Sequence, residues 1–149
     1  MALKPDRIEL LTDISFFMNT AAERGGVVSV VTSTTGVGVS MDDANAVVEY
    51  AAGSGAKPVG ILLNDVVDYD LTRQHINWYR DEMQKGGKVT LLRNGQVTTN
   101  MIASAAIPTA GADAYVGVSG LLGTTGGAKV GQFLSGKDAD GYAKVSVNL

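Results

Sequence analysis

Residues 85–99, KGGKVTLLRNGQVTT, carry the pattern around which we expect the fold to be built. Polar and apolar side chains alternate over residues 88–91, which is the two-residue period of a strand with one buried face. Asn-Gly is the dipeptide that most favours a tight hairpin turn, because both residues tolerate positive φ angles. The stretch therefore predicts two short strands joined by a turn at Asn94 and Gly95.

The composition points to the same class of structure. The 149 residues are 45% hydrophobic, which suffices for one domain with a buried core. Nineteen glycines against three prolines, with only 18% charged residues, favour many short strands joined by tight turns. We therefore expect a mainly β protein, a small single-domain β-barrel or β-sandwich with an extended N-terminal arm and at most one short helix.

The charge balance and the lack of cysteine exclude several classes of function. Twelve basic and fifteen acidic residues give a net charge of −3, so no general attraction to nucleic acid is expected. Without cysteine there are no disulfides, thiolate metal sites or cysteine nucleophiles. No secretory signal pattern opens the sequence, and no apolar run is long enough to span a membrane. We expect a soluble protein made in the cytoplasm.

Further strands are predicted where β-branched and apolar residues run between glycine-rich turns. Residues 143–149 give the clearest case, since apolar and polar residues alternate to the end of the sequence. The preceding DADG, residues 138–141, is predicted to be a turn. The other strands are expected at residues 27–32, 46–50, 59–63, within 113–120 and at 130–134, with Pro58 suited to the first position of its strand.

The first twenty residues form a distinct apolar segment that includes Ile14, Phe16 and Phe17. Two roles are open for it: an N-terminal arm that packs against a neighbouring subunit, or the first strand or helix of the chain's own core. The domain plan is an arm over residues 1–20 and a β domain over residues 21–149. If the segment is an arm, deleting residues 1–17 leaves the β fold intact.

The two halves of the β domain show a weak sequence similarity to each other. GGVVSV at 25–30 resembles GGKVTL at 86–91, and GAKPVGILL at 55–63 resembles GAKVGQFL at 127–134. The order is the same in both halves, although the spacing differs. We interpret the domain as two similar β units, about 25–65 and 86–149, rather than a repeat array.

The aromatic residues of the middle of the chain gather just before the expected hairpin. Residues 71–84 contain helical spacing without a clean apolar stripe, so both a short helix and an extended segment are open. Aromatic rings beside arginines suit an interface, although Trp78 is equally suited to closing the end of the core. The candidate contact residues here are Tyr69, Arg73, His75, Trp78, Tyr79 and Arg80.

No catalytic or metal-binding motif is complete. His75 is the only histidine, and no GxSxG sequence accompanies it, so a triad with Asp65 or Asp70 is a minor alternative. DADG lacks the later ligands of a calcium loop, and the glycine-rich pieces match neither phosphate-binding fingerprint. We therefore expect no enzyme activity, no cofactor and no metal, and a structural function by elimination.

The residue patterns of three segments, and the order of these segments, resemble those of the capsid decoration, or cement, proteins of tailed phages. These segments are residues 70–100, 113–120 and 130–149, with a looser likeness over 25–64. The resemblance implies a β protein on the outer face of the virion, where it clamps subunits of the major capsid protein, most often as a homotrimer. The expected partners are thus the major capsid protein and further copies of the chain.

A carbohydrate- or surface-binding β module is the alternative function. Tyr50, Tyr69, Trp78 and Tyr79 would then form a flat platform on which a ligand stacks. Aromatic rings exposed together on one face would favour this alternative, whereas rings buried in contacts would favour the capsid role.

Overall fold

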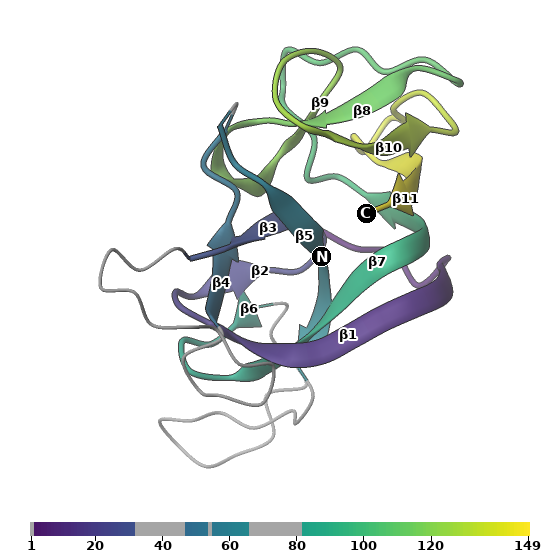
Figure 1. Cartoon of the computed structure of the whole chain (residues 1–149). Helices are drawn as coiled ribbons and strands as arrows, with labels where there is room; N and C mark the ends of the chain where they lie inside the picture. Colours follow the sequence, from purple (N-terminus) through teal and green to yellow (C-terminus); the bar gives the residue numbers. More distant parts are fainter. Residues whose placement is uncertain (1, 32–46, 54, 66–81) are drawn as a thin grey trace.

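A computed structural model describes residues 2–31, 47–53, 55–65 and 82–149, and these residues form one mainly β domain (Figure 1). The predicted fold class is confirmed, since strands predominate and the single helical element among the described residues is a 3-10 turn, η1 (Val118–Gly120). The strands are β1 (Ile8–Met18), β2 (Ala22–Glu23), β3 (Val27–Val30), β4 (Val47–Tyr50), β5 (Pro58–Asp65), β6 (Glu82–Met83), β7 (Lys88–Thr99), β8 (Asp113–Val116), β9 (Leu122–Gly123), β10 (Lys129–Phe133) and β11 (Ala143–Asn148).

Nine strands form one mixed sheet in the order β1-β4-β3-β5-β7-β11-β10-β8-β9, and β1 also pairs with β7. The β1–β4 pair is parallel and the other pairs are antiparallel. A separate two-stranded sheet joins β2 to β6. β5 pairs with β7, so both predicted β units belong to the same sheet. A closed barrel is not shown by the part of the chain that the structure describes.

The predicted hairpin at Asn94 and Gly95 is wrong, because β7 runs through both residues as one strand of twelve. Gly95 lies in the middle of the ladder, opposite Glu9 on one side and Val147 on the other. Its φ of +153° is a conformation that side chains disfavour, and a Cβ atom there would clash with the carbonyl oxygen of Ile8. The glycine therefore serves the close approach of a neighbouring strand rather than a turn.

The N-terminal segment is a strand of the sheet. β1 pairs antiparallel with β7 from Ile8 to Phe17, and its end at Met18 pairs with β4. Further back, Leu3 forms a bridge with Thr99, so the chain follows β7 along nearly its whole length (Figure 1). Of the two roles left open by the sequence, the structure shows the first strand of the chain's own core.

Side chains on the two faces of the central strands enter two different hydrophobic clusters. In β5, Ile61 and Leu63 point into the first cluster and Leu62 into the second, as the alternation of a strand requires. The N-terminal segment contributes to both, with Leu3 in the first cluster and Phe16 and Met18 in the second. The largest fully buried side chains are Phe133, Met18, Ile61, Leu62, Leu63, Met83, Leu91, Leu92 and Leu122.

Most of the remaining strand predictions are confirmed. β3, β4, β5, β8, β10 and β11 lie where the sequence places them, and Pro58 is the first residue of β5. The turn at residues 138–141 is confirmed by the hydrogen bond from Gly141 N to Asp138 O, 3.0 Å, and by the positive φ of Gly141. The choice between helix and extended chain for residues 71–84 falls mainly outside the described residues, but Glu82 and Met83 form β6.

Tyr50 ties β4 to β2 and to the segment that precedes β3. Its hydroxyl donates to the carbonyl oxygen of Glu23 at 2.6 Å. Its ring packs so closely against Gly26 and Gly120 that a Cβ atom on either glycine would clash with it. Burial of the ring raises the pKa of Tyr50 to about 12. The residue is therefore a packed, hydrogen-bonded part of the fold.

The raised pKa of Tyr50 predicts a loss of stability in alkali. An unfolded tyrosine ionises near 10.0, so between pH 10 and about 12 only the unfolded state releases this proton, and the free energy of unfolding falls as pH rises. Tyr50→Phe is expected to cost about 1 kcal/mol at pH 8, where the hydrogen bond is intact. This deficit should shrink above pH 10 and can be measured by urea unfolding at pH 8, 10 and 11. A deficit that grows with pH would contradict the assignment.

Candidate contact surface

Four large apolar side chains are exposed along the outer half of β1, and we call them the β1 apolar row. Their exposed fractions are 48% for Ile8, 73% for Leu10, 53% for Leu11 and 51% for Ile14. Single exposed apolar residues are common on proteins, whereas several along one strand form a candidate contact site. The row is the clearest candidate for a functional surface among the described residues.

Irregular pairing explains why this half of β1 is exposed while the other half is buried. The β1–β7 register shifts between Glu9 and Leu11, between Leu11 and Thr12, and again between Asp13 and Phe16. Such bulges insert residues that have no cross-strand partner and change which face later side chains occupy. Ile14 and Phe16 therefore differ in environment although a regular strand would place them on one face.

The outer half of β1, which carries the row, is also an edge of the sheet. From Ile8 to Phe16, the strand pairs on one side with β7, and the described residues place no strand on its other side. The backbone N–H of Ser15 donates to Asp13 Oδ1 at 2.8 Å, so this N–H group already has a hydrogen-bond partner. Edges of this kind are open to contact with another chain.

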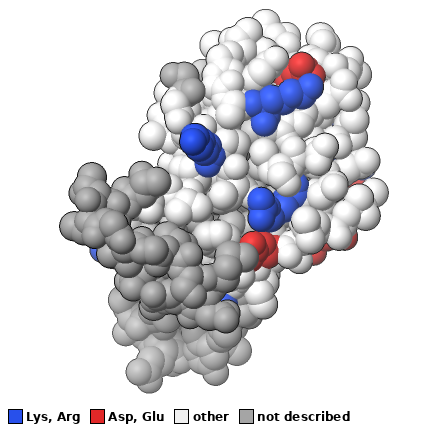
Figure 2. Space-filling model, in the orientation of Figure 1, with Lys and Arg blue, Asp and Glu red and all other residues white. Residues whose placement is uncertain are grey.

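The charged groups next to the row are neutralised within the chain. Arg7 pairs with Glu9, and Arg93 Nη1 lies 3.9 Å from Asp13 Oδ2. On the face shown in Figure 2, the charged side chains are scattered among uncharged ones and form no large patch of one sign. Arg7, Glu9, Arg93 and Asp13, which lie in or beside the outer half of β1, are thus engaged in ion pairs within the chain.

The structure separates the candidate contact residues of the N-terminal segment. Ile14 is exposed and belongs to the row, while Phe16 is only 7% exposed and packs in the second hydrophobic cluster. Phe17 is partly exposed, with Lys88 Nζ 5.6 Å from the centre of its ring. Phe16 is thus a core residue, because the register shift before it turns its ring inward.

The other candidate contact residues lie outside the described part of the chain, so their prediction stands as it was made. They are Tyr69, Arg73, His75, Trp78, Tyr79 and Arg80, and the carboxylate of Asp70 that a triad would use is outside it too. Of the four aromatic residues proposed as a stacking platform, only Tyr50 is described, and its ring is packed against the backbone. Tyr50 is thus partly buried, and the prediction of a platform stays as it was made.

The sequence places Leu10 and Leu11, the most exposed members of the row, in the apolar N-terminal segment, but they are not among the candidate contact residues predicted from it. One feature of the sequence could have indicated their exposure. The two leucines are adjacent and lie between Glu9 and Asp13, so they interrupt the alternation of a strand. Adjacent apolar residues within a strand are compatible with a bulge.

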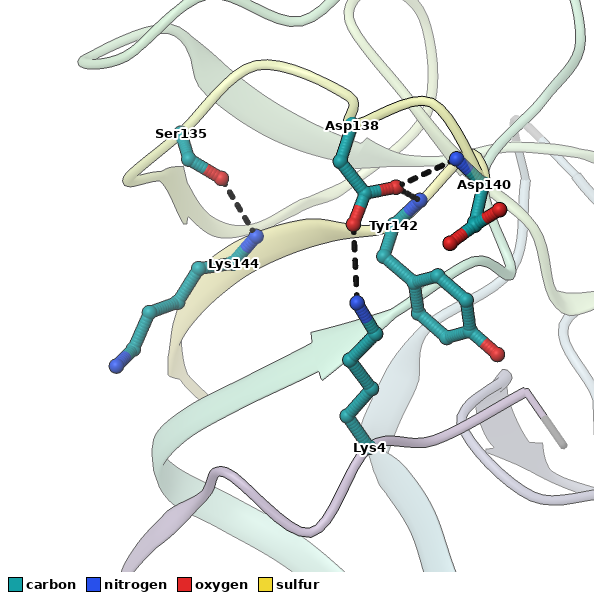
Figure 3. Close-up of polar contacts among 6 residues, drawn as sticks. All are labelled: Lys4, Ser135, Asp138, Asp140, Tyr142 and Lys144. Carbon is teal, nitrogen blue, oxygen red and sulfur yellow. Dashed lines mark hydrogen bonds and ion pairs between the residues drawn. The ribbon is translucent and has the colours of Figure 1, made fainter.

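A polar cluster joins the N-terminal segment to the turn between β10 and β11 (Figure 3). Lys4 Nζ lies 2.9 Å from Asp138 Oδ2 and 4.3 Å from the centre of the Tyr142 ring. The other carboxylate oxygen of Asp138 accepts from the backbone N–H groups of Asp140 and Tyr142, at 3.0 and 2.8 Å. The hydrogen bond from Lys4 lowers the pKa of Asp138, and Asp138 in turn raises the pKa of Lys4. DADG is thus an Asp-capped turn that holds the N-terminus.

The described residues lack two features that would point to other classes of function. No group of three or more histidine, cysteine, aspartate or glutamate side chains is placed to hold a metal ion within the described ranges. Among the helical residues that the structure describes, none forms a helix long and apolar enough to cross a membrane.

Comparison with known proteins adds no family to these observations. No family model matches the chain, and no curated protein shows significant similarity to it in sequence.

Proposed function

We propose that this chain is a structural virion protein that binds the outer surface of a tailed-phage capsid and cements neighbouring subunits of the major capsid protein. The β1 apolar row carries the proposal, because an exposed apolar strip on a stable β domain is the kind of surface that a larger assembly covers. The resemblance of residues 70–100, 113–120 and 130–149 to decoration proteins supports the choice of a capsid. In this proposal the chain acts without catalysis or a cofactor and assembles as a homotrimer.

The physical basis of such a role is avidity and linkage. A single small contact binds weakly, but several linked contacts on a repetitive lattice raise the overall affinity by orders of magnitude. A protein that binds only the mature shell stabilises that shell, because binding lowers the free energy of the bound state alone. A compact domain with a short apolar strip meets both requirements.

Sedimentation with capsids tests the proposed function. Purified protein is mixed at micromolar concentration with expanded, undecorated capsids of the cognate phage, and unexpanded capsids serve as the control. We expect the protein to sediment with the expanded shells and to raise the temperature at which they disassemble. Protein that stays in the supernatant with both kinds of shell would refute the proposal.

A further inference from the structure

We propose that Asn94 is a conditional modification site: it deamidates only in chains whose β7 has separated from β11, and the isoaspartate that forms then prevents refolding. The proposal is independent of the proposed function. It starts from the Asn-Gly dipeptide, a turn sequence that here lies within a strand. Asparagine is a thermolabile residue, and a following glycine gives the backbone the freedom that the reaction needs, because it has no Cβ atom.

The reaction needs only water and joins the side chain of Asn94 to the backbone of Gly95. The Gly95 nitrogen gives up its proton and forms a bond to Cγ of Asn94. The bond from Cγ to Nδ2 breaks, and Nδ2 leaves as ammonia together with that proton. Water then opens the five-membered imide. Opening at Cγ gives aspartate, whereas opening at the main-chain carbonyl of residue 94 gives isoaspartate, in which the chain runs through Cβ and Cγ.

The ladder between β7 and β11 protects the Gly95 nitrogen. The N–H of Leu149 donates to the carbonyl oxygen of Arg93 at 2.9 Å. Hydrogen-bonded and non-hydrogen-bonded pairs alternate along an antiparallel ladder. Two residues further along β7 in an unbroken register, Gly95 and Val147 are therefore the next hydrogen-bonded pair. The Gly95 N–H can lose its proton only after this pair opens, which is also the requirement for amide hydrogen exchange.

The protecting pair lies close to one end of β11. That strand ends at Asn148, one residue beyond Val147, and the bond from Leu149 lies just past it. The free energy of opening is lowest where elements fray and rises toward the core. On the other side of β7, the register with β1 is shifted beside the same dipeptide. Separation of the last residues of β11 is therefore the step that exposes the site.

Isoaspartate at position 94 is incompatible with the ladder. It adds one methylene group to the main chain of β7, so the N–H and C=O groups on its two sides no longer match their partners together. Gly95 is paired with Glu9 on one side and Val147 on the other, and even a Cβ atom there would clash with the carbonyl oxygen of Ile8. A chain modified while open is thus excluded from the fold, which limits how long an unfolded copy stays recoverable.

The first test compares deamidation of the full chain at pH 9 in the folded state and in guanidinium chloride. Sodium chloride brings the folded sample to the same ionic strength. Proteolysis and mass spectrometry identify the peptide that contains Asn94, and chromatography separates its aspartate and isoaspartate forms. We expect the reaction in the folded protein to be at least about tenfold slower, because it requires opening. Equal rates in the two states would overturn the proposal.

The second test compares Leu149→Pro with Leu149→Ala. Proline removes the N–H that bonds to the carbonyl oxygen of Arg93, while alanine keeps it and also shortens the side chain. Circular dichroism verifies that both variants fold. We expect folded Leu149→Pro to deamidate at Asn94 at least about threefold faster than Leu149→Ala. Equal rates in the two variants would overturn the assignment of the protecting step to β11.

The third test measures refolding, with Asn94→Gln as the matched control. Glutamine keeps the amide group but would have to close a larger ring, so it reacts more slowly. Both proteins are held in guanidinium chloride at pH 9 for equal times and then diluted into native buffer. We expect the wild type to lose refolding yield in proportion to its isoaspartate content and Asn94→Gln to keep its yield. Equal losses in the two proteins, or isoaspartate in the refolded fraction, would overturn the proposal.

Discussion

Replacing Gly95 with alanine is expected to destabilise the protein by about 3 kcal/mol or more. The φ of +153° is strained for any residue with a Cβ atom, and the added methyl group would overlap the carbonyl oxygen of Ile8 in β1. Because Gly95 is paired with both β1 and β11, the backbone cannot shift without disturbing two ladders. Urea unfolding followed by circular dichroism measures the loss.

Gly111→Ala is the matched control for this substitution. Gly111 also has a positive φ, +90°, but no atom lies within 4 Å of the position that its Cβ would take. It should therefore cost only the backbone strain, about 1 to 2 kcal/mol. Equal losses at the two glycines would show that β1 does not approach Gly95 and would favour the turn predicted from the sequence.

Phe16→Ala is expected to lower the free energy of unfolding by about 3 to 5 kcal/mol. The ring is 7% exposed and packs with Met18, Leu62 and Leu91 in the second hydrophobic cluster, so its removal leaves a cavity. The result bears on the N-terminal segment as a whole, because an arm that is separate from the domain would contribute no stability. Equilibrium unfolding in urea measures the loss.

Ile14→Ala, two residues earlier in the same strand, provides the comparison. Ile14 is 51% exposed, and its substitution should change stability by less than about 1 kcal/mol. Similar small losses for both variants would mean that β1 is not part of the core. For the same reason, deletion of residues 1–17 should unfold the protein, because it removes Leu3 and Phe16 from the two hydrophobic clusters.

The sequence was sufficient for the fold class and for most strands, because alternation and glycine-rich turns are local properties. It was misleading at Asn94 and Gly95, where the same dipeptide that favours a hairpin lies inside a long strand. The deciding factor is the passage of β1 over Gly95, a contact between residues more than eighty positions apart. No local pattern contains that information.

The exposure of the N-terminal side chains was predicted only in part, and the reason is again non-local. An apolar N-terminal segment was evident, but which of its residues are exposed depends on the register shifts of β1 against β7. These shifts expose Leu10 and Leu11 and bury Phe16, although Phe16 was among the candidate contact residues and Leu10 and Leu11 were not. The polar cluster of Lys4, Asp138 and Tyr142 likewise joins the two ends of the chain.

Hydroxyl-radical footprinting of the protein bound to expanded capsids tests the central claim most directly. The claim is that β1 belongs to the fold and presents its outer side chains to the capsid. In the free protein, Leu10 and Leu11 should be modified readily and Phe16 should be protected. On the capsid, modification of Leu10 and Leu11 should fall severalfold, because the contact excludes solvent from hot-spot side chains. Ile107, which is 84% exposed and lies outside β1, should stay unchanged as the internal control. Bound protein in which Leu10 and Leu11 remain as reactive as before would contradict the account.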